Sequence, residues 1–174
     1  MAAGDWLLRY GRSSRDELRA AVSAYPGRRG RGKLAVAVEC LDAASESPKE
    51  SEVRTLLLLA GLPAPEVNPS IRDPLGRFVA RVDLFFRVFG EVLEYHGDHH
   101  RTDRSQWRRD RTREAELESL GLHVTEITNS DVERPRALVE RTARNLRRRG
   151  WSGELRLSPY FPTDKAETRG ATPS

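Results

Sequence analysis

The chain has 174 residues, of which 37% are hydrophobic and 32% charged, with a net charge of +4. This length suits one domain with appendages, and the single cysteine, Cys40, excludes an intrachain disulfide and fits a reducing cytosol. No N-terminal signal segment is present and no apolar run approaches the ~20 residues that cross a bilayer, so we expect a cytoplasmic protein without a membrane partner.

Nearly all of the positive charge comes from arginine. Of the 30 basic residues, all but Lys33, Lys49 and Lys165 are arginines. Because a guanidinium donates two parallel hydrogen bonds to a phosphate, this composition favours a nucleic-acid partner. A GC-rich genome, which encodes arginine wherever a solvated cation suffices, accounts for the same count equally well. Local arginine clusters therefore carry more weight than the total.

The first 46 residues are expected to form an N-terminal helical extension. The segment from Ser14 to Glu17 has the sequence of a capping box and predicts a helix that ends before Tyr25. A basic loop over 28–32 separates it from a short alanine-rich helix over 34–44. The apolar residues concentrate after this region, so the core is expected in the domain that follows.

From residue 48 the predicted order is helix, three strands, helix, strand, helix. Ser47 and Pro48 begin a leucine-rich helix that ends at Gly61. The remaining elements are strands over 66–72, 78–86 and 91–95, a helix over 103–120, a strand over 122–127 and a helix over 129–149. Hairpin strands followed by a crossover helix predict an α/β fold with a mixed four-stranded sheet flanked by helices, in a domain over 47–150. Residues 151–174 are expected to form a polar C-terminal tail.

Two acidic residues, Asp83 and Glu94, stand in otherwise apolar predicted strands. If the chain turns near Gly90, positions 83 and 94 lie opposite one another, about 5 Å apart between Cβ atoms. Like charges in that position repel unless they are neutralised, and a divalent cation is the usual neutraliser. A salt bridge to a nearby arginine would explain either acid alone. The two together predict a metal-dependent hydrolytic site.

A dense polar cluster, His96, Asp98, His99 and His100, follows the second of these strands. A histidine there can accept a proton from water or stabilise a leaving group, because imidazole titrates near neutrality. Zinc is disfavoured, because structural zinc sites usually have four ligands with paired spacing and Cys40 is isolated. A solvated polar loop is the remaining alternative.

Arginines crowd the loop and helix after this cluster. Arg101, Arg104, Arg108 and Arg111 recur at helical spacing and predict a basic stripe beside the candidate site. Such a stripe suits the phosphate backbone of a nucleic acid. An exposed helix face balanced by acidic neighbours such as Asp110 accounts for the same pattern.

Together these residues resemble a nuclease family. Asp, then about ten residues, then Glu-x-basic on the next strand is similar to the PD-(D/E)xK nuclease superfamily, whose restriction-endonuclease-like αβββαβ core matches the predicted order. The segments 47–52, 61–63, 82–84, 94–100 and 107–110 look like an actinobacterial branch related to very-short-patch-repair endonucleases. The resemblance covers about residues 47–149, and the Glu-Tyr-x-Gly-x-x-His stretch is its most specific part.

The resemblance implies a metal centre. Asp83 and Glu94 would bind Mg²⁺ or Mn²⁺ together with the backbone carbonyl of Tyr95. Glu52 would be the acid of the first helix of the core. Its place in the first helical turn also favours the helix dipole, which is a sufficient structural reason for an acid there.

The resemblance also bears on the histidines and on partners. His100 or His99 would be the active-site histidine after the strand. His96 departs from the lysine that the superfamily prefers, so it either acts as a base or marks a weakened site. Longer relatives carry an N-terminal winged-helix region resembling antitoxin or abortive-infection regulators, and residues 1–45 resemble only the end of one.

Two functions are therefore carried forward. The first is a metal-dependent endonuclease that hydrolyses phosphodiester bonds, with DNA as the favoured substrate. The second is a catalytically inactive nucleic-acid-binding or regulatory module on the same scaffold, belonging to a toxin–antitoxin or defence system with a protein partner.

Overall fold

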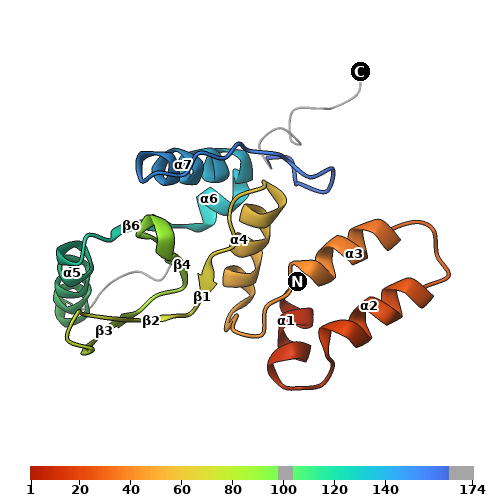
Figure 1. Cartoon of the computed structure of the whole chain (residues 1–174), viewed down its shortest axis with the longest axis horizontal. Helices are drawn as coiled ribbons and strands as arrows, with labels where there is room; N and C mark the ends of the chain where they lie inside the picture. The colour runs from red at the N-terminus through yellow and green to blue at the C-terminus, as the bar shows by residue number, and fades with distance from the viewer. Residues whose placement is uncertain (98–103, 165–174) are drawn as a thin grey trace.

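The computed structural model describes residues 1–97 and 104–164, with the side chains of 104–110 left aside. It has an α/β fold, in which N-terminal helices precede a mixed four-stranded sheet with helices and a separate two-stranded hairpin (Figure 1). The predicted fold class is confirmed.

The N-terminal region consists of α1 (Ala2–Arg9), α2 (Arg15–Ala24) and α3 (Arg31–Glu39). The capping box at the start of α2 is present, because Ser14 accepts from the N–H of Glu17 and Glu17 accepts from the N–H of Ser14. The helix expected over 34–44 begins and ends earlier than predicted. Helix α1 was not predicted, and no side chain caps its first turn.

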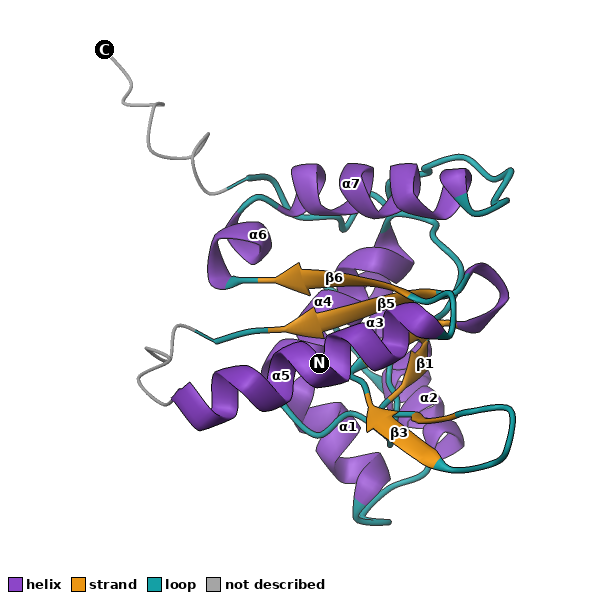
Figure 2. Ribbon diagram, turned by 90° about the vertical axis from the view of Figure 1, so that its left-hand side faces the viewer, coloured by secondary structure: helices purple, strands orange, loops and turns teal. Residues whose placement is uncertain are grey.

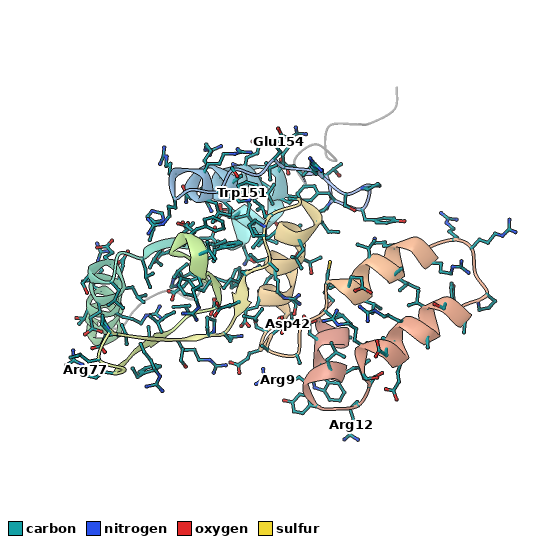
Figure 3. The ribbon with its side chains drawn as sticks, in the orientation of Figure 1. Arg9, Arg12, Asp42, Arg77, Trp151 and Glu154 are labelled. Atoms are coloured by element: carbon teal, nitrogen blue, oxygen red, sulfur yellow. The ribbon has the colours of Figure 1, made fainter. Side chains whose placement is uncertain are left out.

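A buried ion pair fastens these helices to α4 (Pro48–Leu59). Arg54 donates to Asp5 at 2.8 Å, and both side chains are almost fully buried. Arg54 also contacts the carbonyl of Cys40, and the N–H of Asp42 donates to Asp5 at 2.8 Å. Figure 3 shows Asp42 and Arg9 at this junction. The polar contacts fix α1 against the N-terminal end of α4.

The main sheet has the order β1 (Glu66–Val67), β4 (Leu84–Phe86), β5 (Glu91–Tyr95), β6 (His123–Ile127). The first two pairs are antiparallel, and β5 pairs with β6 in parallel through the crossover helix α5 (Arg104–Ser119) (Figure 2). A short 3-10 turn, Arg87–Phe89, joins β4 to β5 and ends at Gly90, whose φ of 59° suits glycine. A turn was predicted at this place.

The two longest predicted strands are each broken. Strand β2 (Ser70–Arg72) pairs with β3 (Phe78–Arg81) in a separate hairpin, so 66–72 and 78–86 do not form single strands. The first break lies at Asn68, whose φ of 51° is left-handed, next to Pro69. The second lies at Val82 and Asp83, where the chain passes from the hairpin to the main sheet.

The second break also changes which residues share a face. Val82 packs with Phe85 on the α5 side of the sheet, whereas Leu84 and Phe86 pack with α4 and α7 on the other side. Val82 and Leu84, two residues apart, therefore lie on opposite faces, which the alternation of a regular strand would not give. Both faces of β4 are covered, which explains why its three residues are all apolar and buried.

The helices after β6 cover the face opposite α5. The single helix expected over 129–149 is divided into α6 (Asn129–Glu133) and α7 (Pro135–Arg148), because Pro135 cannot continue a preceding helix. The segment 151–164 runs back along α4, where its backbone donates to the carbonyls of Ala60 and Leu59. Trp151 packs against this core, and so do Leu155 and Phe161.

Candidate functional site

Asp83 and Glu94 lie next to each other at the end of the β4–β5 pair. The register pairs Leu84 with Leu93, which places residue 83 beside residue 94. The carboxylate of Asp83 accepts a hydrogen bond of 2.8 Å from the N–H of Tyr95. The pairing of β4 with β5 begins at Leu84, so the N–H of Tyr95 bonds to the side chain of Asp83 and not to the backbone of a paired strand residue. The predicted proximity of the two acids is confirmed.

Glu94 is buried, and the two oxygens of its carboxylate differ in their hydrogen bonding. Its Oε2 contacts the guanidinium of Arg113 on α5, which also donates to the carbonyl of Arg81 at 3.2 Å. Its Oε1 is buried and has no hydrogen-bond partner among the described residues. A buried oxygen without a donor is costly, so a ligand at this point would stabilise it.

The pKa of Glu94 is raised to about 6. Burial is the largest cause, and the negative charge of Asp83 adds to it, while Arg113 opposes both. The pKa of Asp83 is also raised, first by burial and then by the charge of Glu50, against the hydrogen bond from Tyr95. Two neighbouring acids that hold their protons tightly are a frequent property of functional sites.

Glu50 is the acid of α4 whose charge acts on Asp83, and no site role was predicted for it. It is buried, and it accepts from Asn68 at 2.6 Å and from the N–H of Glu46 at 2.9 Å. Glu52, the predicted helix acid, instead forms an exposed ion pair with Lys49 at 2.9 Å. The helical spacing of Glu50 with the buried Val53 and Leu57 was the signal that could have identified it.

His96 lies at the open edge of the site, close to two acids. Its Nε2 is 3.8 Å from Glu94 and 3.5 Å from Glu126, which stands opposite Glu94 on β6. Tyr95 points to the other side, where its hydroxyl donates to Asn129 at 2.7 Å. Glu94 and His96 thus lie on one side of β5 and Tyr95 on the other, in keeping with strand alternation.

The predicted basic stripe is described only in part. Arg104, Arg108 and Arg111 all lie on α5, and the exposed Arg111 pairs with Glu114 at 2.7 Å. Arg101 and the predicted histidine His100 lie outside the described residues, as does His99.

Arg113 is the arginine of α5 that reaches the candidate site, and no site role was predicted for it. It lies one helical turn before the buried Leu117, on the face of α5 that meets the sheet. The four-residue spacing of Arg113 and Leu117 was visible in the sequence, but α5 contains many other arginines from which Arg113 could not be distinguished.

The donor set fits a hard divalent cation. Mg²⁺ is commonly bound by one or two carboxylates, with water and substrate phosphate completing its coordination. Asp83 and Glu94 supply two carboxylates, one with a buried unpartnered oxygen. No group of three or more His, Cys, Asp or Glu side chains suited to a metal ion occurs in the part of the chain that the structure describes. The fit therefore depends on this pair of acids.

The chain is similar to two curated proteins of Mycobacterium tuberculosis. These are Uncharacterized protein MT2308 of strain CDC 1551 / Oshkosh and Uncharacterized protein Rv2248 of strain ATCC 25618 / H37Rv. Each is 34% identical over 154 residues, covering 88% of this chain and 56% of the relative. The chain thus spans about half the length of the curated relatives it matches. No family model matches the chain, and no solved structure matches it significantly.

Within residues 1–97 and 104–164, no helix combines the length and apolar composition that a membrane span requires.

Proposed function

We propose that the chain is a metal-dependent endonuclease that hydrolyses phosphodiester bonds in DNA. The observation that carries the proposal is the buried Oε1 of Glu94, which has no hydrogen-bond partner among the described residues, beside a second, half-buried acid, Asp83. Both carboxyl groups have a raised pKa, which a bound cation would lower again by favouring their charged forms. A cation beside Oε1 of Glu94 would therefore stabilise both carboxylates in their charged forms.

Each residue of the site has a distinct part in this proposal. Asp83, Glu94 and the backbone carbonyl of Tyr95 would hold Mg²⁺ or Mn²⁺, which when bound polarises a phosphate oxygen and lowers the pKa of a nearby water. Arg113 fixes the orientation of Glu94 through its other oxygen. His96 stands at the open edge, where it can take a proton from the attacking water.

The resemblance to the PD-(D/E)xK superfamily supports the same assignment. The order α4–β1–β4–β5–α5–β6 is similar to its αβββαβ core, and the two acids lie where β4 begins and β5 ends. We infer that Glu50, and not Glu52, is the helix acid, because the charge of Glu50 acts on Asp83. The basic face of α5 would contact the phosphate backbone.

Plasmid nicking in Mg²⁺ or Mn²⁺ tests the proposal. Asp83→Ala should abolish nicking, whereas Asp16→Ala, which removes an exposed acid of α2, should leave it unchanged. Glu50→Gln should weaken nicking more than Glu52→Gln does. Nicking by the Asp83→Ala protein at the wild-type rate would contradict the proposal.

One observation favours the second function, a catalytically silent nucleic-acid-binding module. The guanidinium of Arg113 partly neutralises Glu94 without a metal ion. This alternative predicts salt-sensitive DNA binding, no cleavage in either metal, and binding that Asp83→Ala leaves intact. Gel-shift and nicking assays on the same preparations separate the two functions.

A further inference from the structure

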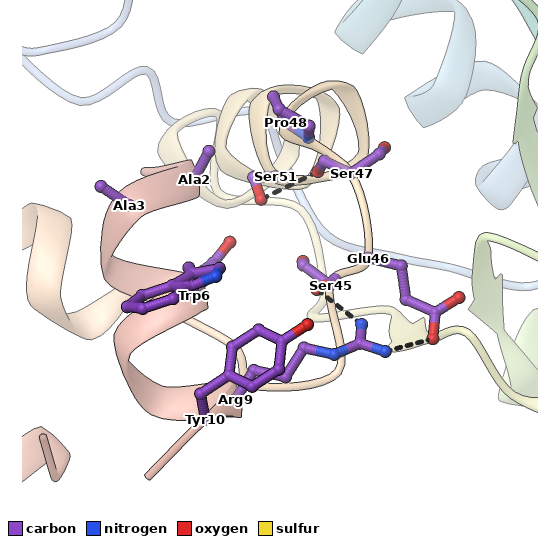
Figure 4. Close-up of a pocket in the computed structure, with 11 residues that line it drawn as sticks. Ala2, Ala3, Trp6, Arg9, Tyr10, Ser45, Glu46, Ser47, Pro48 and Ser51 are labelled. Atoms are coloured by element: carbon purple, nitrogen blue, oxygen red, sulfur yellow. Dashed lines mark hydrogen bonds and ion pairs between the residues drawn. The ribbon is translucent and has the colours of Figure 1, made fainter. Parts of the chain in front are cut away.

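A pocket of about 560 Å³ lies between α1 and the segment 45–51 that leads into α4 (Figure 4). Its volume falls in the range typical of ligand sites. It is separate from the pair of acids on β4 and β5, and no residue of that pair lines it.

One wall of the pocket is aromatic. Trp6 on α1 and Tyr10, which directly follows the last residue of α1, have ring centroids 5.1 Å apart and remain 52% and 59% exposed. Figure 4 shows both rings on the α1 side of the pocket. Large aromatic side chains left open to solvent in this way offer flat surfaces on which nucleobases stack.

The opposite wall offers a hydrogen-bonding group and positive potential. Ser45 is only 6% exposed, and its Oγ has no hydrogen-bond partner among the described residues. Ser47 caps the twelve-residue helix α4, whose N-terminal end favours anions. A nucleotide combines the two properties that these walls select, a flat base with polar edges and an anionic phosphate.

Most charged side chains around the pocket are paired with one another. Glu46 accepts from Arg9 at 2.7 Å and from Arg81 at 2.7 Å, so two guanidinium groups face one carboxylate. The nearby Asp5 is neutralised by Arg54. With the buried Glu50, which accepts from the N–H of Glu46, the charged side chains near this wall balance, so the attraction for an anion rests on the N-terminal end of α4.

The pocket is connected to the candidate site by contacts between side chains and backbone. Arg81, which holds Glu46 at the pocket, also accepts through its carbonyl from Arg113 at 3.2 Å. Arg113 in turn contacts Glu94. A strand positioned at the acids can thus continue along Arg81 to the aromatic wall.

We propose that this pocket binds an unpaired nucleotide of the nucleic-acid strand, with the base against Trp6 and Tyr10 and a polar edge on Ser45. The inference rests on the proposed function for the choice of nucleic acid. It adds that the protein prefers strands with an unpaired segment.

Fluorescence anisotropy without divalent ions tests the pocket, because cleavage then has no influence. The probes are a fluorescein-labelled single-stranded oligodeoxynucleotide, the RNA of the same sequence and the DNA duplex. Trp6→Ala should weaken binding of a single-stranded probe by about tenfold and binding of the duplex by less than about twofold. Trp6→Phe, which keeps an aromatic ring, should retain most of the wild-type affinity for the single-stranded probe. Of the DNA and RNA single strands, the one whose affinity falls more in the Trp6→Ala variant carries the sugar that the pocket prefers.

Two further variants exclude trivial causes. Ser45→Ala removes a buried hydroxyl without a partner, so it should weaken single-strand binding while leaving the urea midpoint unchanged or higher. Phe78→Ala removes an exposed aromatic ring of β3 away from the pocket and should leave binding unchanged.

The outcomes separate this inference from the proposed function. If Trp6→Ala binds both single-stranded probes like the wild type, or weakens duplex binding equally, the pocket assignment is wrong whatever the nicking assay shows. If the protein binds single strands through Trp6 but does not cleave DNA, the pocket assignment stands and the endonuclease proposal is wrong.

Discussion

The raised pKa of Glu94 leads to a quantitative prediction about stability. Burial, partly offset by Arg113, raises this pKa from the ordinary value of 4.5 to about 6. The folded protein therefore binds a proton at Glu94 more tightly than the unfolded chain does. Ionised Glu94 must then cost folding free energy.

The sign and size of that cost follow from the two pKa values. Below about pH 4.5 the carboxyl is protonated in both states and costs nothing, and the cost develops as the pH rises through about 6. A shift of this size corresponds to about 2 kcal/mol. The raised pKa of Asp83 adds a loss of the same sign.

Glu94→Gln should remove the share that belongs to Glu94. The amide keeps the shape of the side chain and its oxygen can still accept from Arg113. We expect the variant to gain up to about 2 kcal/mol over the wild type above about pH 7, and nothing below about pH 4.5. Urea unfolding followed by circular dichroism across this range measures the difference.

Glu66→Gln is the control with the opposite sign. Arg87 lowers the pKa of Glu66, so that carboxylate contributes stability above its unfolded-state pKa, and the amide should lose it as the pH rises. A difference between Glu94→Gln and the wild type that does not change with pH would refute the reasoning.

Three other substitutions test the structure by urea unfolding. Glu91→Ala should cost about 3–5 kcal/mol, because Glu91 is fully buried and accepts from Thr125, among other donors; an unchanged midpoint would contradict its burial. Arg54→Ala should cost about 3–5 kcal/mol by leaving Asp5 buried without a partner, and removing both charges together should cost less than the two single changes combined. Asn68→Ala should cost at least about 1 kcal/mol because of its left-handed backbone, whereas Asn68→Gly should cost less; equal losses would argue against strain.

Local signals in the sequence predicted much of the fold. Ser14 and Glu17 identified the start of α2, and Ser47 with Pro48 identified the start of α4, because side-chain caps act within a few residues. The hairpin with a turn ending at Gly90 was likewise local. Its register then brought residues 83 and 94 together, which is why the two acids could be predicted.

Long-range contacts set the parts that the sequence did not reveal. The apolar run around Val82 reads as one strand, but pairing with β2 on one side of it and β1 on the other divides it between two sheets. Pro135 was a visible break that the arginine-rich pattern of α7 outweighed. Helix α1 has no side-chain cap, and the buried pair of Asp5 with Arg54, far apart in the chain, fixes it in place.

The candidate site shows the same division. Asp83, Glu94 and His96 come from one hairpin and were predicted together. Arg113 and Glu50 reach the site from two helices, and the helix face on which each lies depends on packing. Of the two acids near the start of α4, Glu50 is buried and Glu52 is exposed, and the sequence alone does not distinguish them.

Calorimetric titration of Mn²⁺ tests the central claim most directly. If Asp83 and Glu94 grip a cation, the wild type should bind Mn²⁺ at one site per chain, Asp83→Asn should weaken it by at least about tenfold, and Asp16→Asn should bind like the wild type. Binding of Mn²⁺ that Asp83→Asn leaves unchanged, or no binding by the wild type, would contradict the account.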